Sequence, residues 1–414
     1  MKKINLKWVN EIPDSWDVLP IKAIFNERKE NNNPIKTRDI LSLTNDRGVI
    51  PYAEKGEQGN KSKEDVSEYK LAYPGDIVAN SMNLIIGSVG ISNYYGCVSP
   101  VYYMLYPTDD KKYDRRYFYY QMYTNEFEKS LYGLGNGILE IRMRRPMTKL
   151  NMVEMIVPPY ETQKAIADLL DKKINEIDDL IVSLRKEQET LEEMSECLVV
   201  DTIFNGLKKE NKKDSGIDYI GSIPESWEVT VLGNVLKKEN HELKPDQELL
   251  VCSNSGNVVK KTETKTGLVS DTENNYQGVE IGELLIHGMD TWHGAMGISQ
   301  YYGKCTGVVH CCTSDQNLKF YYYYMRALAF KKVYKLISNG VRENTSDFRS
   351  WAKLAAILVV KPNLREQEDI ANYLDVRCEK IIDLIKMKEV EIEKVKEYKK
   401  SLIYEYVTGK KEVC

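Results

Sequence analysis

Two stretches of the chain place apolar residues at alternating intervals of three and four. In the first stretch the apolar positions are Leu170, Ile174, Ile177, Ile181, Leu184, Leu191 and Leu198, interrupted only at Gln188 and Ser195. In the second they are Leu374, Cys378, Ile381, Ile385, Ile392, Val395 and Leu402, interrupted at Lys388 and Lys399. This spacing gives a helix one apolar stripe and is typical of coiled coils. We predict two long helices, each beginning after proline (Pro158, Pro362) and ending near glycine (Gly206, Gly409).

Each predicted helix covers roughly 40 residues, or about 60 Å at 1.5 Å per residue. A helix of this length with an exposed apolar stripe needs a partner, and the other stripe is the natural one. We therefore expect the two helices to pack antiparallel, in a pseudo-two-fold arrangement with a globular domain at each end. The alternative is that each helix packs only on its own globular domain, although helices of that kind are rarely so long.

The residues before each helix have a different pattern. Short β-type runs, such as 98–106 and 307–313, alternate with Gly, Asn and Tyr, which indicates mixed domains dominated by strands. The predicted fold class is therefore α+β, with two tandem mixed α/β domains joined by two long antiparallel coiled-coil helices. We place the first domain at 1–157, a central helix and linker at 158–214, the second domain at 215–360 and a C-terminal helix at 361–414.

The whole pattern occurs twice. Ile12 to Trp16 (IPDSW) returns as Ile223 to Trp227 (IPESW), and Pro74 to Ile77 (PGDI) returns as Ile281 to Leu284 (IGEL). The later matches pair Gly90 to Ser92 with Gly297 to Ser299, Asn136-Gly137 with Asn339-Gly340, and Pro158, Gln163, Ala167 and Asp171 with Pro362, Gln367, Ala371 and Asp375. A period of about 200 residues is too long for a solenoid and indicates a duplicated pair of domains. Two similar halves imply two similar tasks.

This ordered set of motifs, present twice, resembles the specificity subunits of type I restriction-modification systems over essentially the whole chain. The resemblance implies that 1–157 and 215–360 are target-recognition domains, each reading one half of a bipartite duplex DNA site. The helices would set the spacing between half-sites and dock two methyltransferase subunits. Restriction subunits would be further partners, with S-adenosylmethionine on the methyltransferase subunits and ATP and Mg²⁺ on the restriction subunits. The sequence departs from the family pattern at Thr162, which precedes Gln163. The second copy has the usual glutamate there, Glu366 before Gln367.

The charge changes this picture. The chain of 414 residues has a formal net charge of −4, whereas a self-sufficient nucleic-acid binder usually carries a basic domain. The acidic excess lies in 158–214, which contains 14 acidic and nine basic residues. We expect weak DNA affinity for the chain alone, because neutralisation of phosphates supplies much of such binding. The chain has neither an apolar run near the roughly 18 residues of a membrane span nor a signal-peptide pattern, so we expect a cytoplasmic protein.

Patterns that would indicate catalysis are incomplete. The eight cysteines include no CxxC pair, which argues against a zinc site. Gly133 to Gly137 followed by Pro158-Pro159-Tyr160 has the look of an S-adenosylmethionine loop with an amino-methyltransferase motif. However, Val157 stands where that motif needs Asn or Asp to hold the target amino group. We therefore expect no catalytic residue, cofactor or metal in this chain.

Two groups of polar residues are candidates for DNA contact. One follows the N-G turns and comprises Asn136, Arg142, Arg144 and Arg145 in the first domain and Asn339, Arg342, Asn344 and Arg349 in the second. The other follows the central strands and comprises Asn80, Ser81 and Asn83 in the first domain and His287, Asp290, Trp292 and His293 in the second. Arginine suits bidentate contacts with guanine or phosphate, and asparagine suits adenine. Each of these residues could instead be an ordinary solvated surface or turn residue.

Two other functions stay open at this point. A two-headed coiled-coil scaffold that binds protein or RNA would show the same repeat and the same helices. A self-contained enzyme would have to transfer methyl groups without partner subunits. Exchange of residues 1–157 for the domain of a related protein separates DNA reading from the scaffold function. A DNA reader would change one half of its methylated site and keep the other.

Overall fold

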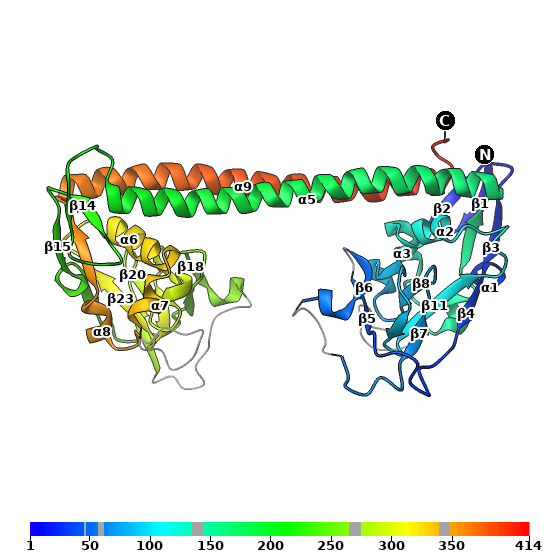
Figure 1. Ribbon diagram of the computed structural model, residues 1–414, viewed down its shortest axis with the longest axis horizontal. Coiled ribbons are helices and arrows are strands. Elements are labelled where there is room, and N and C mark those ends of the chain that lie inside the picture. The colour runs from blue at the N-terminus through cyan, green and yellow to red at the C-terminus, as the bar shows by residue number, and fades with distance from the viewer. Residues whose placement is uncertain (45–46, 57–61, 135–143, 265–274, 339–347, 414) are drawn as a thin grey trace. The chain divides into compact units, whose positions relative to one another are not determined.

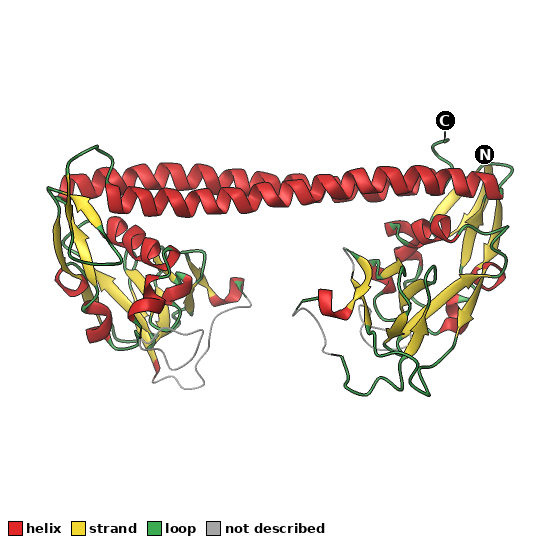
Figure 2. Ribbon diagram, viewed as in Figure 1, coloured by secondary structure: helices red, strands yellow, loops and turns green. Residues whose placement is uncertain are grey.

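The computed structural model describes residues 1–44, 47–56, 62–134, 144–264, 275–338 and 348–413. The chain divides into two compact units: unit 1 is Met1–Leu184 with Val390–Cys414, and unit 2 is Arg185–Glu389. Each unit combines strands and helices, which confirms the predicted mixture of the two (Figure 2). Two long helices, α5 (Tyr160–Asn205) and α9 (Leu364–Val407), contribute residues to both units.

Unit 1 is built on an antiparallel four-stranded sheet in the order β4-β11-β8-β9. Its strands are β1 (Lys2–Leu6), β2 (Val9–Ile12), β3 (Asp17–Pro20), β4 (Phe25–Arg28), β5 (Leu41–Thr44), β6 (Gly48–Pro51), β7 (Lys70–Ala72), β8 (Ile77–Asn80), β9 (Val89–Ile91), β10 (Gly96–Val98), β11 (Tyr102–Pro107) and β12 (Glu154–Val157). Its short helices are α1 (Ile21–Ile24), η1 (Tyr52–Glu54), η2 (Leu84–Ile86), α2 (Arg115–Met122), α3 (Asn125–Ser130) and α4 (Met147–Leu150).

Unit 2 repeats the sheet in the order β16-β23-β20-β21. Its strands are β13 (Lys212–Asp214), β14 (Ser222–Pro224), β15 (Glu228–Val231), β16 (Lys237–Glu239), β17 (Leu250–Cys252), β18 (Val258–Lys260), β19 (Tyr276–Val279), β20 (Leu284–His287), β21 (Met296–Ile298), β22 (Gly303–Thr306), β23 (Val309–Thr313) and β24 (Leu358–Lys361). Its short helices are η4 (Leu232–Asn234), η5 (Lys261–Glu263), η7 (Thr291–His293), α6 (Leu318–Phe330), α7 (Val333–Ile337) and α8 (Trp351–Ala355). The repeat in the sequence is thus a repeat of topology.

The central strands explain why the P-G-D-I and I-G-E-L segments recur. All four residues of β8 and all four of β20 are buried, so each strand reads as a short apolar run ending in a polar residue. The acidic residue before each strand is buried against a nitrogen-bearing side chain. Asp76 accepts two hydrogen bonds from the Arg28 guanidinium, at 2.8 and 3.1 Å, and Glu283 lies 2.6 Å from His241 Nε2.

The IP-x-SW motif packs against the end of a long helix in each unit. In unit 1, α9 ends just before Gly409, whose φ of +71° is a left-handed conformation that glycine adopts without strain. A Cβ there would come within 2.5 Å of Pro13 Cγ and 3.0 Å of Trp16 Cη2. In unit 2, Gly206 also has a φ of +71°, and a Cβ would lie 3.2 Å from Trp227 Cζ2. Glycine is needed at both helix ends for its backbone and for the close approach.

A glutamine near the start of α5 ties this helix to the rest of unit 1. Gln163 is buried, and its Oε1 accepts a hydrogen bond of 2.9 Å from the backbone N–H of Asp114, the N-cap of α2. Its Nε2 donates to the carbonyls of Lys112 and Pro158, at 3.0 and 2.8 Å. One side chain thus satisfies three backbone groups at the junction of two helices.

Gln367 has the equivalent place in unit 2, where it bonds two backbone groups. Its Oε1 accepts from the backbone N–H of Asn317, the N-cap of α6, at 3.1 Å, and its Nε2 donates to the carbonyl of Pro362 at 2.8 Å. A second repeated contact lies about two turns further along each long helix. In unit 1 the Tyr120 hydroxyl donates to Asp171 at 2.7 Å. In unit 2 the Tyr323 hydroxyl donates to Asp375 at 2.9 Å. Helices α2 and α6 therefore lie between the long helices and the sheet of their units (Figure 1).

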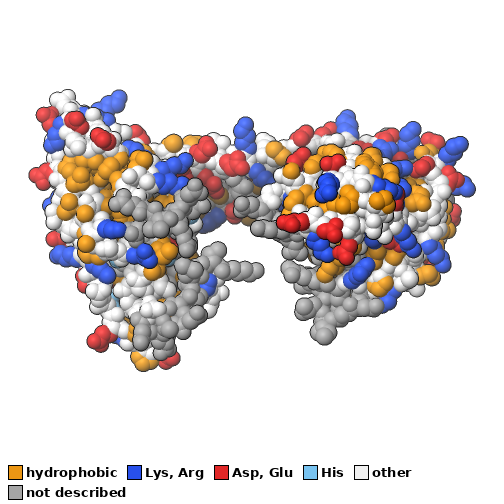
Figure 3. Space-filling model, turned by 60° about the horizontal axis from the view of Figure 1, so that its bottom comes forward, with side chains coloured by type: hydrophobic (Ala, Val, Ile, Leu, Met, Phe, Trp, Pro, Cys, Tyr) orange, Lys and Arg blue, Asp and Glu red, His pale blue; other side chains and the backbone are white. Residues whose placement is uncertain are grey.

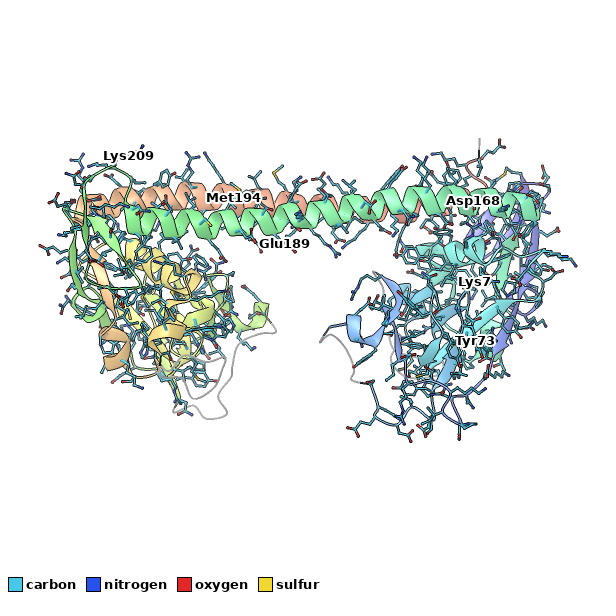
Figure 4. All side chains as sticks on the ribbon, in the orientation of Figure 1. Lys7, Tyr73, Asp168, Glu189, Met194 and Lys209 are labelled. Atoms are coloured by element: carbon cyan, nitrogen blue, oxygen red, sulfur yellow. The ribbon has the colours of Figure 1, made fainter. Side chains whose placement is uncertain are left out.

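Within each unit, α5 and α9 run antiparallel and pack through the predicted apolar stripe. The stripe residues are buried or half-buried, whereas Val182 and Met387, outside it, are 65% and 66% exposed, and Met194, labelled in Figure 4, is also exposed. Polar residues that interrupt the stripe meet the other helix. The pairs are Lys399 with Asp178 at 2.7 Å in unit 1, and Gln188 with Ile385 at 3.3 Å, Ser195 with Cys378 at 4.0 Å and Lys388 with Glu187 at 2.8 Å in unit 2.

Candidate nucleic-acid interface

In unit 1 an open cavity of about 580 Å³ lies beside the segment that follows the central strand β8. This segment contributes Asn80, Met82 and Asn83 to the lining. The other lining residues include Ser42 from β5, Tyr52 from η1, Lys55 and Lys63 from the segments after it, and Val101 and Tyr102 at the start of β11. The cavity thus combines amide, hydroxyl and ammonium groups on an apolar floor, the mixture expected of a recognition pocket.

Asn80 is one of the buried polar residues that line this cavity. Its side chain is only 8% exposed, and its Oδ1 accepts a hydrogen bond of 3.0 Å from the backbone N–H of Met82. Among the described residues, the side-chain Nδ2 of Asn80 has no hydrogen-bond partner. A fixed carboxamide with a remaining donor can read a base edge or another planar polar group.

Unit 2 has a cavity of about 570 Å³ in the corresponding place, beside the segment that follows β20. This segment contributes His287, Asp290 and His293 to the lining. Opposite them lies the turn between β17 and β18, with Ser253, Asn254 and Ser255. The two cavities therefore share their position in the fold but differ in their polar side chains.

His287 is held next to Asp290. Its Nδ1 lies 3.2 Å from both the backbone N–H and the carboxylate Oδ2 of Asp290. Burial lowers the pKa of His287, and the nearby Asp290 carboxylate opposes this only in part. The imidazole is thus neutral at pH 7, and the cavity offers a carboxylate next to a neutral ring.

The sequence predicted one wall of each cavity and missed the other. Asn80 and Asn83, and likewise His287, Asp290 and His293, were predicted from their position after a central strand, and the structure places them in the cavities. The β5–β6 and β17–β18 hairpins were not predicted as part of a site. The run 253–257 (SNSGN) between two short apolar strands was a signal for such a turn, since Gly256 has a φ of +91°.

Two predicted residues of unit 1 lie behind the cavity wall. Ser81 is fully buried and donates to the carbonyl of Val101 at 2.6 Å. Arg145 is 2% exposed, and its guanidinium lies 3.4 and 3.5 Å from the carbonyls of Leu131 and Met82. Direct contact of these two side chains with DNA, expected from the sequence, is at odds with their burial. A sequence alone does not distinguish an arginine that supports a loop from one that reaches solvent.

The other predicted arginines and turn residues are in two groups. Arg144 and Arg349 are exposed. Asn136, Arg142, Asn339, Arg342 and Asn344 lie outside the described residues. His293 is exposed next to the half-buried Trp292, with ring centroids 3.5 Å apart, at the rim of the unit 2 cavity.

The charges of the surface agree with the near-neutral sequence of the globular domains. On the face drawn in Figure 3, the lysine and arginine side chains of the described residues are interspersed with aspartate and glutamate. Two lysines line the unit 1 cavity; Lys63 is 2.9 Å from Glu68, and Lys55 lies over the ring of Tyr52 at 5.4 Å. Local positive charge is therefore present at the cavity without a strongly basic domain.

In the part of the chain that the structure describes, no three His, Cys, Asp or Glu side chains are grouped so that they could hold a metal ion. Cys305 and Cys311 are buried, with sulfurs 3.7 Å apart. Their shared hydrogen bond, followed by burial, raises the pKa of Cys311. The described helices include none that is both long and apolar enough to cross a membrane.

Comparisons with known proteins fit this geometry. Residues 13–189 match the model of the type I restriction modification DNA specificity domain. The putative type I restriction enzyme MjaX specificity subunit of Methanocaldococcus jannaschii is 26% identical over 240 residues, covering 55% of this chain and 54% of that protein. The type I restriction enzyme EcoBI specificity subunit of Escherichia coli is 23% identical over 259 residues, covering 57% and 49%. The chain thus spans about half the length of the curated relatives it matches.

A solved structure extends the likeness in fold to nearly the whole chain. The matched chain belongs to a structure that concerns complex assembly and conformational transition of the type I R-M system. It superposes on this chain with a TM-score of 0.69. The alignment covers 97% of this chain and all of the other, at 10% sequence identity, so it concerns the fold alone. Together these comparisons confirm the resemblance that the repeated motifs indicated.

Proposed function

We propose that this chain, which is similar to type I restriction-modification specificity subunits, supplies the DNA sequence specificity of a type I restriction-modification complex. Residues 1–157 and 215–360 are its two target-recognition domains. Each domain reads one half of a bipartite duplex site. The protein acts in the cytoplasm, where it meets its DNA.

The observation that carries this proposal is the pair of cavities that share a position but not a lining. Asn80 and Asn83 in unit 1 offer carboxamides, which suit adenine, whereas Asp290 in unit 2 offers a carboxylate, which suits the amino group of cytosine. A duplicated scaffold with different polar groups at one place is what two unlike half-sites require. Exposed Arg144 and Arg349 would add phosphate contacts that fix the register.

The long helices have a separate task in this proposal. The segments 158–214 and 361–414 form an antiparallel coiled coil that relates the two domains by a pseudo-two-fold axis, sets the spacing of the half-sites and docks two methyltransferase subunits. The antiparallel contacts of α5 and α9 inside each unit support this arrangement. Half-sites are met together only when their separation suits the turn of the duplex, so a stiff spacer is needed.

Chemistry is supplied by the partners. Methyltransferase subunits bring S-adenosylmethionine, restriction subunits bring ATP and Mg²⁺, and this chain has no catalytic role. The near-neutral surface supports this division, because phosphate contacts made by the partners would supply much of the affinity for DNA.

Methylome sequencing tests the proposal directly. Cells that contain the chain and its methyltransferase subunits should show one bipartite methylated motif, which disappears when the gene for the chain is deleted. Exchange of residues 1–157 for the domain of a relative should change one half of that motif and leave the other half unchanged. A motif that is unaltered by the exchange would contradict DNA reading by this domain and support a scaffold that binds protein or RNA.

A further inference from the structure

Helix α6 supports the cavity of unit 2 with two side chains that are one turn apart. The Tyr322 hydroxyl donates a hydrogen bond of 3.0 Å to the carbonyl of Gly256. Arg326 Nη1 donates to the carbonyl of Asn254 at 2.6 Å and to that of Gly294 at 2.7 Å. All three acceptors are backbone groups, so these bonds fix the path of the chain and leave the neighbouring side chains available.

The acceptors belong to opposite walls of the cavity. Asn254 is part of the β17–β18 turn, whose residues Ser253 to Ser255 form one wall. Gly294 directly follows η7 and His293, which belong to the other wall. A single guanidinium group therefore ties the two walls together, and the width of the cavity between them depends on it.

Both walls are pressed closely against these side chains. A Cβ at Gly256 would come within 2.6 Å of the Tyr322 hydroxyl, and a Cβ at Gly294 would come within 2.4 Å of Arg326 Nη1. The glycines have φ values of +91° and +77°, so the backbone adopts conformations that other residues avoid in order to reach the helix. The contacts are thus a built feature of the loop rather than a surface side chain that happens to lie nearby.

Arg326 is buried at a cost in free energy. It is 9% exposed, its burial lowers its pKa, and within the described part of the chain it forms no ion pair with a carboxylate. Burying an arginine without a carboxylate costs free energy that an apolar side chain of the same length would not cost. What the guanidinium adds is the ability to donate in two directions at once.

A neighbouring face of α6 contacts α9. Tyr323 donates to Asp375 at 2.9 Å, and Lys319 forms an ion pair with the same carboxylate. Unit 1 has tyrosines, Tyr119 and Tyr123, at the positions that correspond to Tyr322 and Arg326, and neither can supply a guanidinium. The two-wall contact of Arg326 is therefore a property of the second domain.

We propose that Arg326, assisted by Tyr322, is the positioning residue that sets the sequence specificity of the second recognition domain. The proposal rests on the proposed function, in which the side chains of both walls read base edges. Base readout needs donors and acceptors within about 0.5 Å and 10–20° of the productive geometry. Release of the walls from Arg326 should leave the domain folded but unable to tell the correct base pairs from incorrect ones.

The test uses the chain assembled with its methyltransferase subunits, and duplex oligonucleotides that carry the methylated motif or single base-pair substitutions in either half. Arg326→Met keeps length and packing and removes the donors. We expect it to lower the discrimination in the half-site of the second domain by about tenfold, since one wrong base pair typically costs a factor of this order or more. Discrimination in the other half-site should not change, and Tyr322→Phe should act in the same direction but less.

Tyr323→Phe is the matched control, because it removes an equivalent hydroxyl that bonds Asp375 of α9 and not the cavity walls. It should leave discrimination in both half-sites unchanged. Hydrogen exchange gives a readout that does not depend on DNA. Arg326→Met should accelerate exchange of the Ser253 and Gly256 amides, which close the β17–β18 turn through bonds of 2.8 and 3.1 Å, whereas Tyr323→Phe should not.

The outcomes separate this proposal from the proposed function. If the wild-type complex methylates no bipartite motif, the proposed function fails and the role of Arg326 in specificity fails with it. If the motif is present and Arg326→Met discriminates as well as wild type, only the positioning role is overturned. Equal losses in both half-sites, or equal losses in Arg326→Met and Tyr323→Phe, would show general destabilisation and would also overturn it.

Discussion

Replacing Gln163 with alanine tests whether one side chain joins α5 to the rest of unit 1. The change removes three hydrogen bonds, to Asp114 N–H and to the carbonyls of Lys112 and Pro158. Each bond contributes about 0.5–1.5 kcal/mol net, and backbone groups left buried without partners cost more. We therefore expect Gln163→Ala to lower the free energy of unfolding of unit 1 by about 2–4 kcal/mol. Because every 1.4 kcal/mol is a factor of ten, exchange of the core amides should accelerate about 30- to 900-fold.

Native-state hydrogen exchange read by mass spectrometry is the suitable assay, because it reports unit 1 and unit 2 separately. Gln188→Ala is the control, since Gln188 also lies on α5 but makes a single bond of 3.3 Å to Ile385, and its loss should cost less than about 1 kcal/mol. The reasoning would be refuted if Gln163→Ala accelerated exchange in unit 1 less than threefold, or if Gln188→Ala had as large an effect.

Three further predictions follow from single contacts. All four histidines lie in unit 2, and burial lowers the pKa of His287 and His310. The unfolded chain therefore binds protons at these two residues more readily than the folded chain does. Hydrogen exchange measured between pH 7.5 and 5.5 should show unit 2, and not unit 1, losing stability as the pH falls below the unfolded pKa of about 6.5. Gly409→Ala should lower the midpoint of urea unfolding more than Gly206→Ala, because its Cβ would come within 2.5 Å of Pro13 rather than 3.2 Å from Trp227; equal effects would contradict this. Lys399→Leu should lower the free energy of unfolding by less than about 1 kcal/mol, or raise it, because an apolar stripe residue replaces a half-buried ion pair with Asp178. A loss of about 3 kcal/mol or more in urea unfolding would show that the ion pair is needed.

The fold could be predicted because the recurring residues are those that join distant segments. Gln163 and Gln367 join helix starts to N-caps, and Asp171 and Asp375 accept from tyrosines of α2 and α6. Such contacts fail if either partner changes, so these positions keep their identity in both copies while surface positions diverge. The stripe on the long helices was visible for a simpler reason, since burial on one face imposes its period on the sequence.

The candidate site could be predicted only in part because its walls are distant in the sequence. The segments after β8 and β20 follow apolar runs and were found from that position. The turn between β17 and β18, Ser253 to Ser255, lies more than 30 residues before His287 and meets it only through the fold. Burial was equally hidden, because Arg144 and Arg145 are neighbours of one type, yet the first is exposed and the second supports the chain near Met82.

The two units also differ in what stands behind their cavities, and this limits how specificity can be moved between them. In unit 2 the glycine after η7, Gly294, faces Arg326; in unit 1 the corresponding Gly87 faces Glu128, and a Cβ there would lie 2.7 Å from its Oε1. A guanidinium donates to backbone carbonyls, whereas a carboxylate accepts and is itself held by Lys400 at 3.4 Å. A polar segment transferred from one domain to the other without its supporting helix would therefore meet the wrong partner. Whole domains, and not their loops alone, are the units in which specificity of this chain should be exchanged.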